Sequence, residues 1–395
     1  MITLNAETIK TIIEDIESQQ NKDRKARDFK SYQIFSGNQR EYVKNAICKV
    51  YPEAHTIMRT SNVNLVKKVV NKKSKAYKEP PIRTVNSETS ENLDKIYEKG
   101  SFDDAFRKMD EGYNRSNCGL LWVQNDEFEK TKYRLIFLNQ YTFDLIINND
   151  TLELEAVILS YPKASITAKD YTVYSDGVNQ TIAEHQRDSA NDATVYAMWT
   201  KDQHVNVVRS INKNTTTIDY IETQESSENE NKLGMLPFVW LTNNPYVPEF
   251  PVENQLAEDS IEINILNSTL LTAAQKQIGQ LVMKYPKGSK MNTVHTGFTV
   301  SLELPQATDN DPFIETDAKY IVPNSDLNGM KGVIMDYAAT VLSDNGLEGA
   351  SLSGNMEKFA SGFERLIASA SVVEVQKENQ GIYSKIEKKV FEIIK

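Results

Sequence analysis

The chain has 395 residues, of which 39% are hydrophobic and 25% charged, a composition typical of a folded protein with roughly two to four structural units. Its net charge of −10 argues against a protein that coats nucleic acid. Its two cysteines, Cys48 and Cys118, exclude a disulfide framework.

The charge is unevenly distributed. Residues 1–83 hold 17 Lys and Arg against 9 Asp and Glu, a net charge of +8, whereas the remainder carries −18. Such an uneven distribution of charge is typical either of surfaces that recognise one another by charge within an assembly or of solvated faces that differ in charge. No apolar stretch is long enough to cross a bilayer, and Glu7, Glu14 and Asp15 are unlike a signal peptide, so we expect a soluble protein made in the cytoplasm.

The N-terminal third repeats apolar residues at helical spacing. Ile9, Ile12, Ile13 and Ile16, for example, share one helical face. The third such segment must end near Pro80, because proline has no N–H to donate and restricts the residue before it. The pattern predicts helices over residues 6–19, 38–50, 62–78 and about 102–117.

The period then changes from helical to two residues. Short β-type runs are separated by clusters of Asn, Asp, Lys and Thr, which indicates antiparallel strands. Residues 222–232, rich in Glu, Ser and Asn, indicate an exposed loop. Helices followed by a meander of strands predict an α+β fold. The expected strands cover residues 119–123, 133–138, 143–147, 154–161, 170–174, 194–200 and 204–211.

A buried strand and an unusually long helix follow. Residues 233–239 read Leu-Gly-Met-Leu-Pro-Phe-Val, a hydrophobic run with a turn signal. After a proline-containing loop, apolar residues that include Leu256, Ile263, Leu270 and Leu281 recur at helical spacing among polar ones. We therefore expect a single helix over residues 252–285.

The remainder predicts a small β unit inserted between helices. Residues 298–304 alternate and residues 319–323 return as a second strand, but residues 326–343 are helical again. Glycine and serine then crowd residues 345–354, which lowers the cost of unusual backbone angles. A last helix of nearly forty residues follows.

Catalytic and metal-binding signatures are absent from the sequence. It has no P-loop, HExxH, paired CxxC or calcium-loop pattern, and its four histidines lie far apart. The stretch around Ser351 lacks the glycine two residues later and the preceding strand that a nucleophile elbow requires. We expect a protein that is not an enzyme, without catalytic residues, metal or cofactor. A hydrolase or nucleotidyl-modifying enzyme with an unrecognised site is a distant alternative.

Taken in chain order, these elements resemble the portal proteins of tailed bacteriophages, of the compact kind. Asn-Cys-Gly-Leu-Leu-Trp-Val-Gln-Asn-Asp at 117–126 resembles the helix, glycine and strand of portals. Residues 138–146 are similar to the strand–turn–strand passage of their wing, and residues 154–161 to the strand that leaves it. Residues 233–239 resemble the Gly-hydrophobic-Pro strand ahead of the stem helix. The ordered series over roughly residues 40–395, not any single motif, carries the resemblance.

The resemblance implies an α+β, portal-like fold, with a mixed α/β wing, long stem and wing helices and a small β-containing clip. Portals often continue into a helical crown, but this sequence ends at Lys395, so the crown is expected to be absent or minimal. The implied parts are the wing at 1–251, the stem helix at 252–285, the clip at 286–325, the second stem helix at 326–345, the tunnel loop at 346–357 and the long C-terminal wing helix at 358–395.

The implied function is that of a connector: a homo-oligomeric ring, usually of twelve subunits (a dodecamer), at one capsid vertex of the virion. Double-stranded DNA would pass through its channel without sequence specificity during viral genome packaging and ejection. The implied partners are the major capsid and scaffold proteins, the large terminase and the head-completion or tail adaptor proteins. The chain would be made in the bacterial host cytoplasm and would contact no membrane. The alternative is another ring-forming virion or channel component without a DNA role.

Candidate channel residues lie on the expected stem helix. Uncharged amides suit a conduit through which DNA slides, because dense Lys and Arg would hold the duplex. Lys276 and Lys284, late in the expected helix, could contact phosphates or could favour the helix C-terminus through its dipole. The candidate amides are Asn254, Asn264, Asn267, Gln275 and Gln280.

Two further sites follow from the resemblance. In the ring, the tunnel loop would form the narrowest constriction, with Leu347, Glu348 and Leu352 nearest DNA; an ordinary helix–helix connection is the alternative. The clip would exchange a strand with its neighbour and present an acidic tip to terminase and adaptor, unless the tip is merely solvated. The tunnel-loop candidates are Gly346, Leu347, Glu348, Gly349, Ser351, Leu352 and Gly354. The clip candidates are Asp309, Asp311, Glu315 and Asp317.

A basic face on the expected helix over 62–78 has three interpretations. It could bind scaffold or capsid protein, contact DNA outside the ring, or simply be solvated. It consists of Lys67, Lys68, Lys72, Lys73, Lys75 and Lys78.

Overall fold

A computed structural model describes most of the chain. The described residues are 2–50, 52, 58–79, 81, 83–85, 88–89, 91–125, 133–162, 171–175, 178–181, 194–211, 218–223, 230–242, 250, 255–277, 280–286, 299–304, 317–321, 326–347 and 362–395. The chain divides into two units. The first comprises Met1–Ser36, Val66–Gln255 and Phe359–Lys395, and the second Gly37–Leu65 and Leu256–Lys358.

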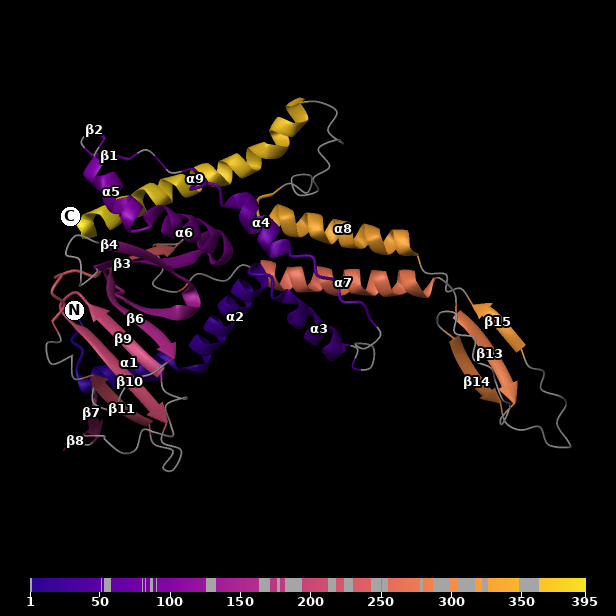
Figure 1. The fold of residues 1–395 in the computed structure, drawn as a ribbon, viewed down its shortest axis with the longest axis horizontal. Helices are drawn as coiled ribbons and strands as arrows, with labels where there is room; N and C mark the ends of the chain where they lie inside the picture. The colour runs from indigo at the N-terminus through magenta and orange to yellow at the C-terminus, as the bar shows by residue number, and fades with distance from the viewer. Residues whose placement is uncertain are drawn as a thin grey trace. The chain divides into compact units, whose positions relative to one another are not determined.

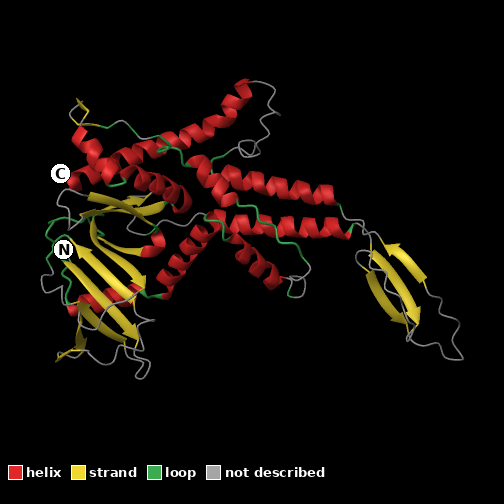
Figure 2. Ribbon diagram, in the orientation of Figure 1, coloured by secondary structure: helices red, strands yellow, loops and turns green. Residues whose placement is uncertain are grey.

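The first unit combines helices with antiparallel sheets (Figures 1 and 2). Its helical elements are α1 (Ala6–Ile16), α2 (Gln19–Phe35), α4 (Leu65–Lys73, from its second residue), α5 (Glu91–Lys99), α6 (Phe102–Ser116), the 3-10 turn η2 (Gln140–Thr142) and α9 (Gly362–Ile394). Helix α6 shows why these segments are helical: Phe102, Phe106, Met109 and Tyr113 recur on one buried face. It ends at Ser116, and the cap residue Asn117 that follows has a left-handed φ of 56°.

The strands of the first unit form two larger sheets and one short hairpin. The seven-stranded sheet has the order β5-β6-β9-β10-β11-β7-β8, the three-stranded sheet the order β12-β3-β4, and all pairs are antiparallel. The hairpin pairs β1 (Thr84–Val85) with β2 (Glu88–Thr89). The remaining bounds are β3 (Cys118–Asn125), β4 (Tyr133–Leu138), β5 (Phe143–Ile147), β6 (Leu154–Pro162), β7 (Tyr171–Ser175), β8 (Val178–Thr181), β9 (Thr194–Thr200), β10 (His204–Ile211), β11 (Ile218–Thr223) and β12 (Phe238–Thr242).

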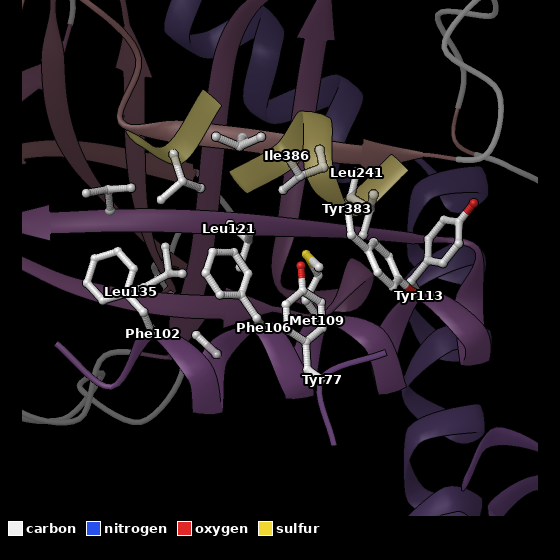
Figure 3. Packing of buried hydrophobic residues seen from close by; sticks show 14 of the residues in the cluster. Tyr77, Phe102, Phe106, Met109, Tyr113, Leu121, Leu135, Leu241, Tyr383 and Ile386 are labelled. Carbon is white, nitrogen blue, oxygen red and sulfur yellow. The ribbon is translucent and has the colours of Figure 1, made fainter. Parts of the chain in front are cut away.

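The alternation of strand side chains builds the first unit in layers. On β6, Ala156 and Ile158 pack against the side that carries α1, whereas Val157 and Leu159 join Leu120 of β3 in a cluster between the two sheets. The opposite face of the three-stranded sheet is covered by α6 and α9. Figure 3 shows this second cluster, which lies between the helices and the three-stranded sheet. In it, side chains of α6 and α9 meet Leu121, Leu135 and Leu241 of the sheet; the helix residues are Phe102, Phe106, Met109, Tyr113, Tyr383 and Ile386.

The second unit contains three helices and a small sheet in its described part. Its elements are α3 (Gln39–Val50), α7 (Leu256–Lys276), β13 (Gln280–Pro286), β14 (Thr299–Leu304), β15 (Asp317–Ile321) and α8 (Leu327–Asp344). Strand β13 is central: it pairs parallel with β14 and antiparallel with β15. The sheet is thus inserted in the chain between α7 and α8, which contact each other.

The α+β fold is confirmed, but several boundaries differ from the expectation. The helix expected over 252–285 ends at Lys276, and Gln280 and Lys284 lie in β13. The alternating run Leu281-Val282-Met283-Lys284-Tyr285 fits a strand as well as a helix, and a two-stranded unit is only marginally stable, so a third strand completes the sheet. Residues 37–65 also group with α7 and α8 and not with the N-terminal part of the expected wing.

Candidate functional site

Helix α7 carries a buried polar stripe. Its members recur every four residues and therefore lie on one face of the helix. The helix accommodates them through side chain to backbone hydrogen bonds one turn back, as from Ser268 Oγ to Asn264 O at 2.6 Å. The stripe consists of Ser260, Asn264, Ser268 and Thr272, each at most 9% exposed.

The stripe binds an extended segment that precedes α4. Val63 N–H donates to Asn264 Oδ1 at 2.7 Å, and Asn264 Nδ2 donates back to Val63 O at 2.8 Å. Two residues earlier, Ser61 N–H donates to Ser268 Oγ at 2.8 Å. The helix thus supplies the hydrogen bonds that a neighbouring strand would otherwise provide. Sequence analysis missed Ser61 and Val63, although the four-residue spacing of Ser, Asn, Ser and Thr on α7 signals a buried polar contact.

The channel role expected for the stem amides is therefore wrong for Asn264, which is fully buried within the second unit. Asn267 and Gln275 are half-buried on α7. With its amide oxygen turned toward Arg59, Gln275 accepts from Nε at 2.8 Å and from Nη2 at 3.2 Å. Lys276 is the last residue of α7, and Asn254 lies outside the described residues.

The placement of Lys284 on a stem helix is also wrong. It lies in β13, where the register pairs it with Asp317 of β15. A candidate DNA contact and a candidate clip residue thus occupy neighbouring strands of one sheet. The other clip candidates, Asp309, Asp311 and Glu315, lie outside the described residues.

Helices α7 and α8 are joined by a polar contact near the first turns of α7. Tyr337 Oη donates to Asp259 Oδ1 at 3.0 Å and lies 3.4 Å from Glu262 Oε2. Partial burial raises the pKa of Asp259, the Tyr337 hydroxyl opposes that rise, and neighbouring Glu262 adds to it. The contact fixes the rotational position of α8 beside α7.

That position leaves large apolar side chains of α8 exposed. Val333 is 62% and Met335 59% exposed, and the two are about 200° apart around the helix axis. Leu271 of α7 is 44% exposed, within a run from 263 to 275 that has no charged residue. Large apolar side chains that gather on an exposed surface are typical of sites that bind another protein.

Helix α8 ends in a Schellman motif. Gly346 has φ of 69°, its N–H donates to Ser343 O at 2.9 Å, and Leu347 N–H donates to Leu342 O at 2.9 Å. The apolar contact that accompanies such a motif explains why Leu347 is only 1% exposed. The expectation that Leu347 contacts DNA is therefore wrong. The candidates Glu348, Gly349, Ser351, Leu352 and Gly354 lie outside the described residues.

The lysine-rich segment is only partly helical. Helix α4 ends at Lys73 instead of continuing to residue 78, because α6 binds the chain that follows: Ser74 Oγ donates to Asp110 O at 3.2 Å and Ala76 N–H to Asp110 Oδ2 at 2.9 Å. Burial lowers the pKa of Lys73. Burial, with repulsion from Lys72 and Lys78, also lowers the pKa of Lys75. The six lysines therefore do not form one regular helical face.

Searches for other kinds of site and for relatives found no match. Among the described residues, no cluster of three or more His, Cys, Asp or Glu is arranged to hold a metal ion. No helix in the described ranges has both the length and the apolar character to cross a membrane. No protein-family model matches the sequence, and no curated protein matches it either.

Proposed function

We propose that this chain is a portal-type ring subunit, which forms a channel for double-stranded DNA at one capsid vertex and docks the terminase and the adaptor proteins. The proposal rests mainly on the insertion of a three-stranded sheet between α7 and α8, two helices in contact. After α8, the chain returns to the first unit, where α9 packs on the three-stranded sheet β12-β3-β4. A helix, small sheet, helix and long returning helix are the order of stem, clip, stem and wing.

The apolar surface of α8 supports a ring in particular. Val333 and Met335 are exposed in opposite directions around the helix. A two-fold dimer needs one self-complementary patch, whereas a closed ring needs two different patches on each subunit, one for each neighbour. Two exposed apolar directions on one helix match the second requirement.

Electron microscopy of the purified full chain, with its mass in solution, tests the proposal. We expect rings with a central hole and rotational symmetry, formed by the chain alone or on co-expression with its capsid protein. A compact dimer without a hole in both preparations would contradict it. DNA packaging into capsids that contain these rings would separate a portal from a ring-forming component without a DNA role.

A further inference from the structure

The second unit contains a basic pocket between α3 and residues 58–60. Arg40 and Lys44 lie four residues apart on α3 and so occupy one face of that helix. Neither pairs with a carboxylate among the described residues. The pocket has a volume of about 600 Å³ and is lined by Arg40, Glu41, Lys44, Met58, Arg59 and Thr60.

Arg59 is the third positively charged side chain of the pocket, and a neutral side chain holds it in place. Gln275 of α7 accepts from Nε and Nη2 of Arg59, at 2.8 and 3.2 Å. Because the partner is a neutral amide, the guanidinium keeps its full charge, and its remaining N–H donors are available to a ligand. The arrangement holds a positive charge at the pocket wall that no carboxylate among the described residues balances.

The chemistry of the lining selects a compact anion with several acceptor oxygens. A guanidinium matches phosphate geometry in a bidentate way, and a lysine adds a compact positive charge. Thr60 contributes a hydroxyl, while Glu41 is the only carboxylate among the lining residues that the structure describes. We propose that this pocket binds a phosphate group, carried either by a free phosphate-bearing molecule or by a nucleic-acid backbone. The proposal does not require the chain to be a portal.

Titration calorimetry of the full chain with sodium phosphate at constant ionic strength tests the proposal. Arg40→Gln, Lys44→Gln and Arg59→Gln should each weaken binding about threefold, as expected for charges that are partly screened by water, and the triple variant at least tenfold. Glu41→Gln should strengthen binding about threefold because it removes the repulsive carboxylate. Lys49→Gln, the same change of charge on α3 outside the pocket, should leave affinity unchanged.

A labelled DNA duplex identifies the source of the phosphate. Duplex binding that free phosphate competes away and that the triple variant weakens would assign the site to a nucleic-acid backbone. Phosphate binding without duplex binding would assign it to a small phosphate-bearing molecule. If neither probe binds, or if the triple variant and Lys49→Gln behave alike, the proposal is wrong. Unchanged thermal unfolding of these exposed-site variants would show that they fold normally.

Discussion

The side chain of Asn264 on α7 satisfies both backbone groups of Val63, which lies 201 residues away in sequence. The carboxamide presents one acceptor and one donor in the geometry of a β-bridge, with distances of 2.7 and 2.8 Å. A helix thereby fixes an extended segment without a second strand. The contact ties residues 61–63 to the centre of the second unit and explains why a long helix carries a buried polar stripe.

Asn264→Ala should destabilise the second unit by about 1 to 3 kcal/mol, because it removes the side-chain acceptor of Val63 N–H and one of the two donors to Val63 O, the other being Leu65 N–H. Asn267→Ala, the same change on a half-buried position of α7, should cost less than about 0.5 kcal/mol. Urea unfolding of the full chain measures both changes in the free energy of unfolding. Equal losses in the two variants would contradict the assigned role of Asn264.

A buried ion pair in the first unit leads to the second prediction. Arg115 Nη1 donates to Asp28 Oδ1 at 2.8 Å, and the two side chains are 2% and 0% exposed. Arg115→Ala should cost about 3 to 5 kcal/mol, because it leaves the carboxylate of Asp28 uncompensated in the interior. Arg107→Ala, which removes the exposed pair with Asp104, should cost less than about 1 kcal/mol. Thermal or urea unfolding would contradict the prediction if the two losses were similar.

The same ion pair shows where sequence analysis fails. Helix α2 was missed because it lacks an apolar stripe: its buried residues are Arg24, Asp28 and Ile34, and Asp28 and Arg115 lie 87 residues apart. Helix α6 and strands β4, β5, β9 and β10 were predicted almost to the residue. Helix α6 buries apolar side chains at helical spacing and β10 buries the alternate residues Val205 and Val207, and this regularity is what periodicity detects. Strands β4 and β5 each bury a single apolar side chain, Leu135 and Phe143, so their alternation in sequence was the stronger signal.

The candidate site was less predictable than the fold. Sequence analysis named Asn264 of the buried stripe, but not Ser260, Ser268 and Thr272 and not the partner segment, because a buried amide and a channel-lining amide have the same pattern. Residues 280–286 read equally well as helix and strand, so only pairing with β14 and β15 decides between them. Leu347 looked like part of a loop, but its backbone closes the end of α8. A contact distant in sequence determined the outcome for Asn264 and for β13, whereas a local turn at the end of α8 determined it for Leu347.

We expect the stability of the folded chain to depend on pH through the buried carboxyl group of Asp110. Burial raises its pKa from 3.8 to about 6, although Tyr383, Ala76 and Asn114 all donate to its carboxylate. The folded chain therefore holds this proton more tightly than the unfolded chain does. The resulting stabilisation is complete below about pH 4 and is lost as pH rises through about 6.

Comparison with Asp110→Asn, which cannot titrate, measures this effect. The free energy of unfolding of the wild type relative to the variant should fall by up to about 3 kcal/mol between pH 4 and pH 7 and then stay level. Asp110→Asn also changes the free energy of unfolding by an amount that does not depend on pH. The quantity to compare is therefore the slope of the free energy of unfolding against pH. Parallel pH profiles for the two proteins would show that Asp110 has an ordinary pKa.

The two cysteines should differ sharply in reactivity. Cys118 is fully buried and accepts a hydrogen bond from Trp240 Nε1 at 3.4 Å, and burial raises its pKa to about 12. Cys48 is partly exposed on α3. At pH 8 we expect a thiol reagent to modify Cys48 of the native chain at least tenfold faster than Cys118. Cys48→Ser should remove the fast reaction, whereas persistence of that reaction would show that Cys118 is accessible.

The last prediction concerns the two apolar side chains of α8, Val333 and Met335, through which we propose that copies of the chain assemble. Val333→Glu or Met335→Glu should abolish the proposed rings, because each would place a charge in the proposed apolar contact between copies. Neither should unfold the chain, since both side chains are exposed. Val333→Leu and Met335→Leu retain the apolar surface and should still form rings.

Mixing the two Glu variants in equal amounts tests the head-to-tail geometry directly. Each variant keeps one intact face, so a Val333→Glu copy can join a Met335→Glu copy at one interface but cannot continue around a ring. We expect mixed dimers by mass measurement and no rings by electron microscopy. Rings from either Glu variant alone would show that its side chain lies outside the subunit contact. Rings that form only from the mixture would contradict the assignment of these two side chains to separate interfaces.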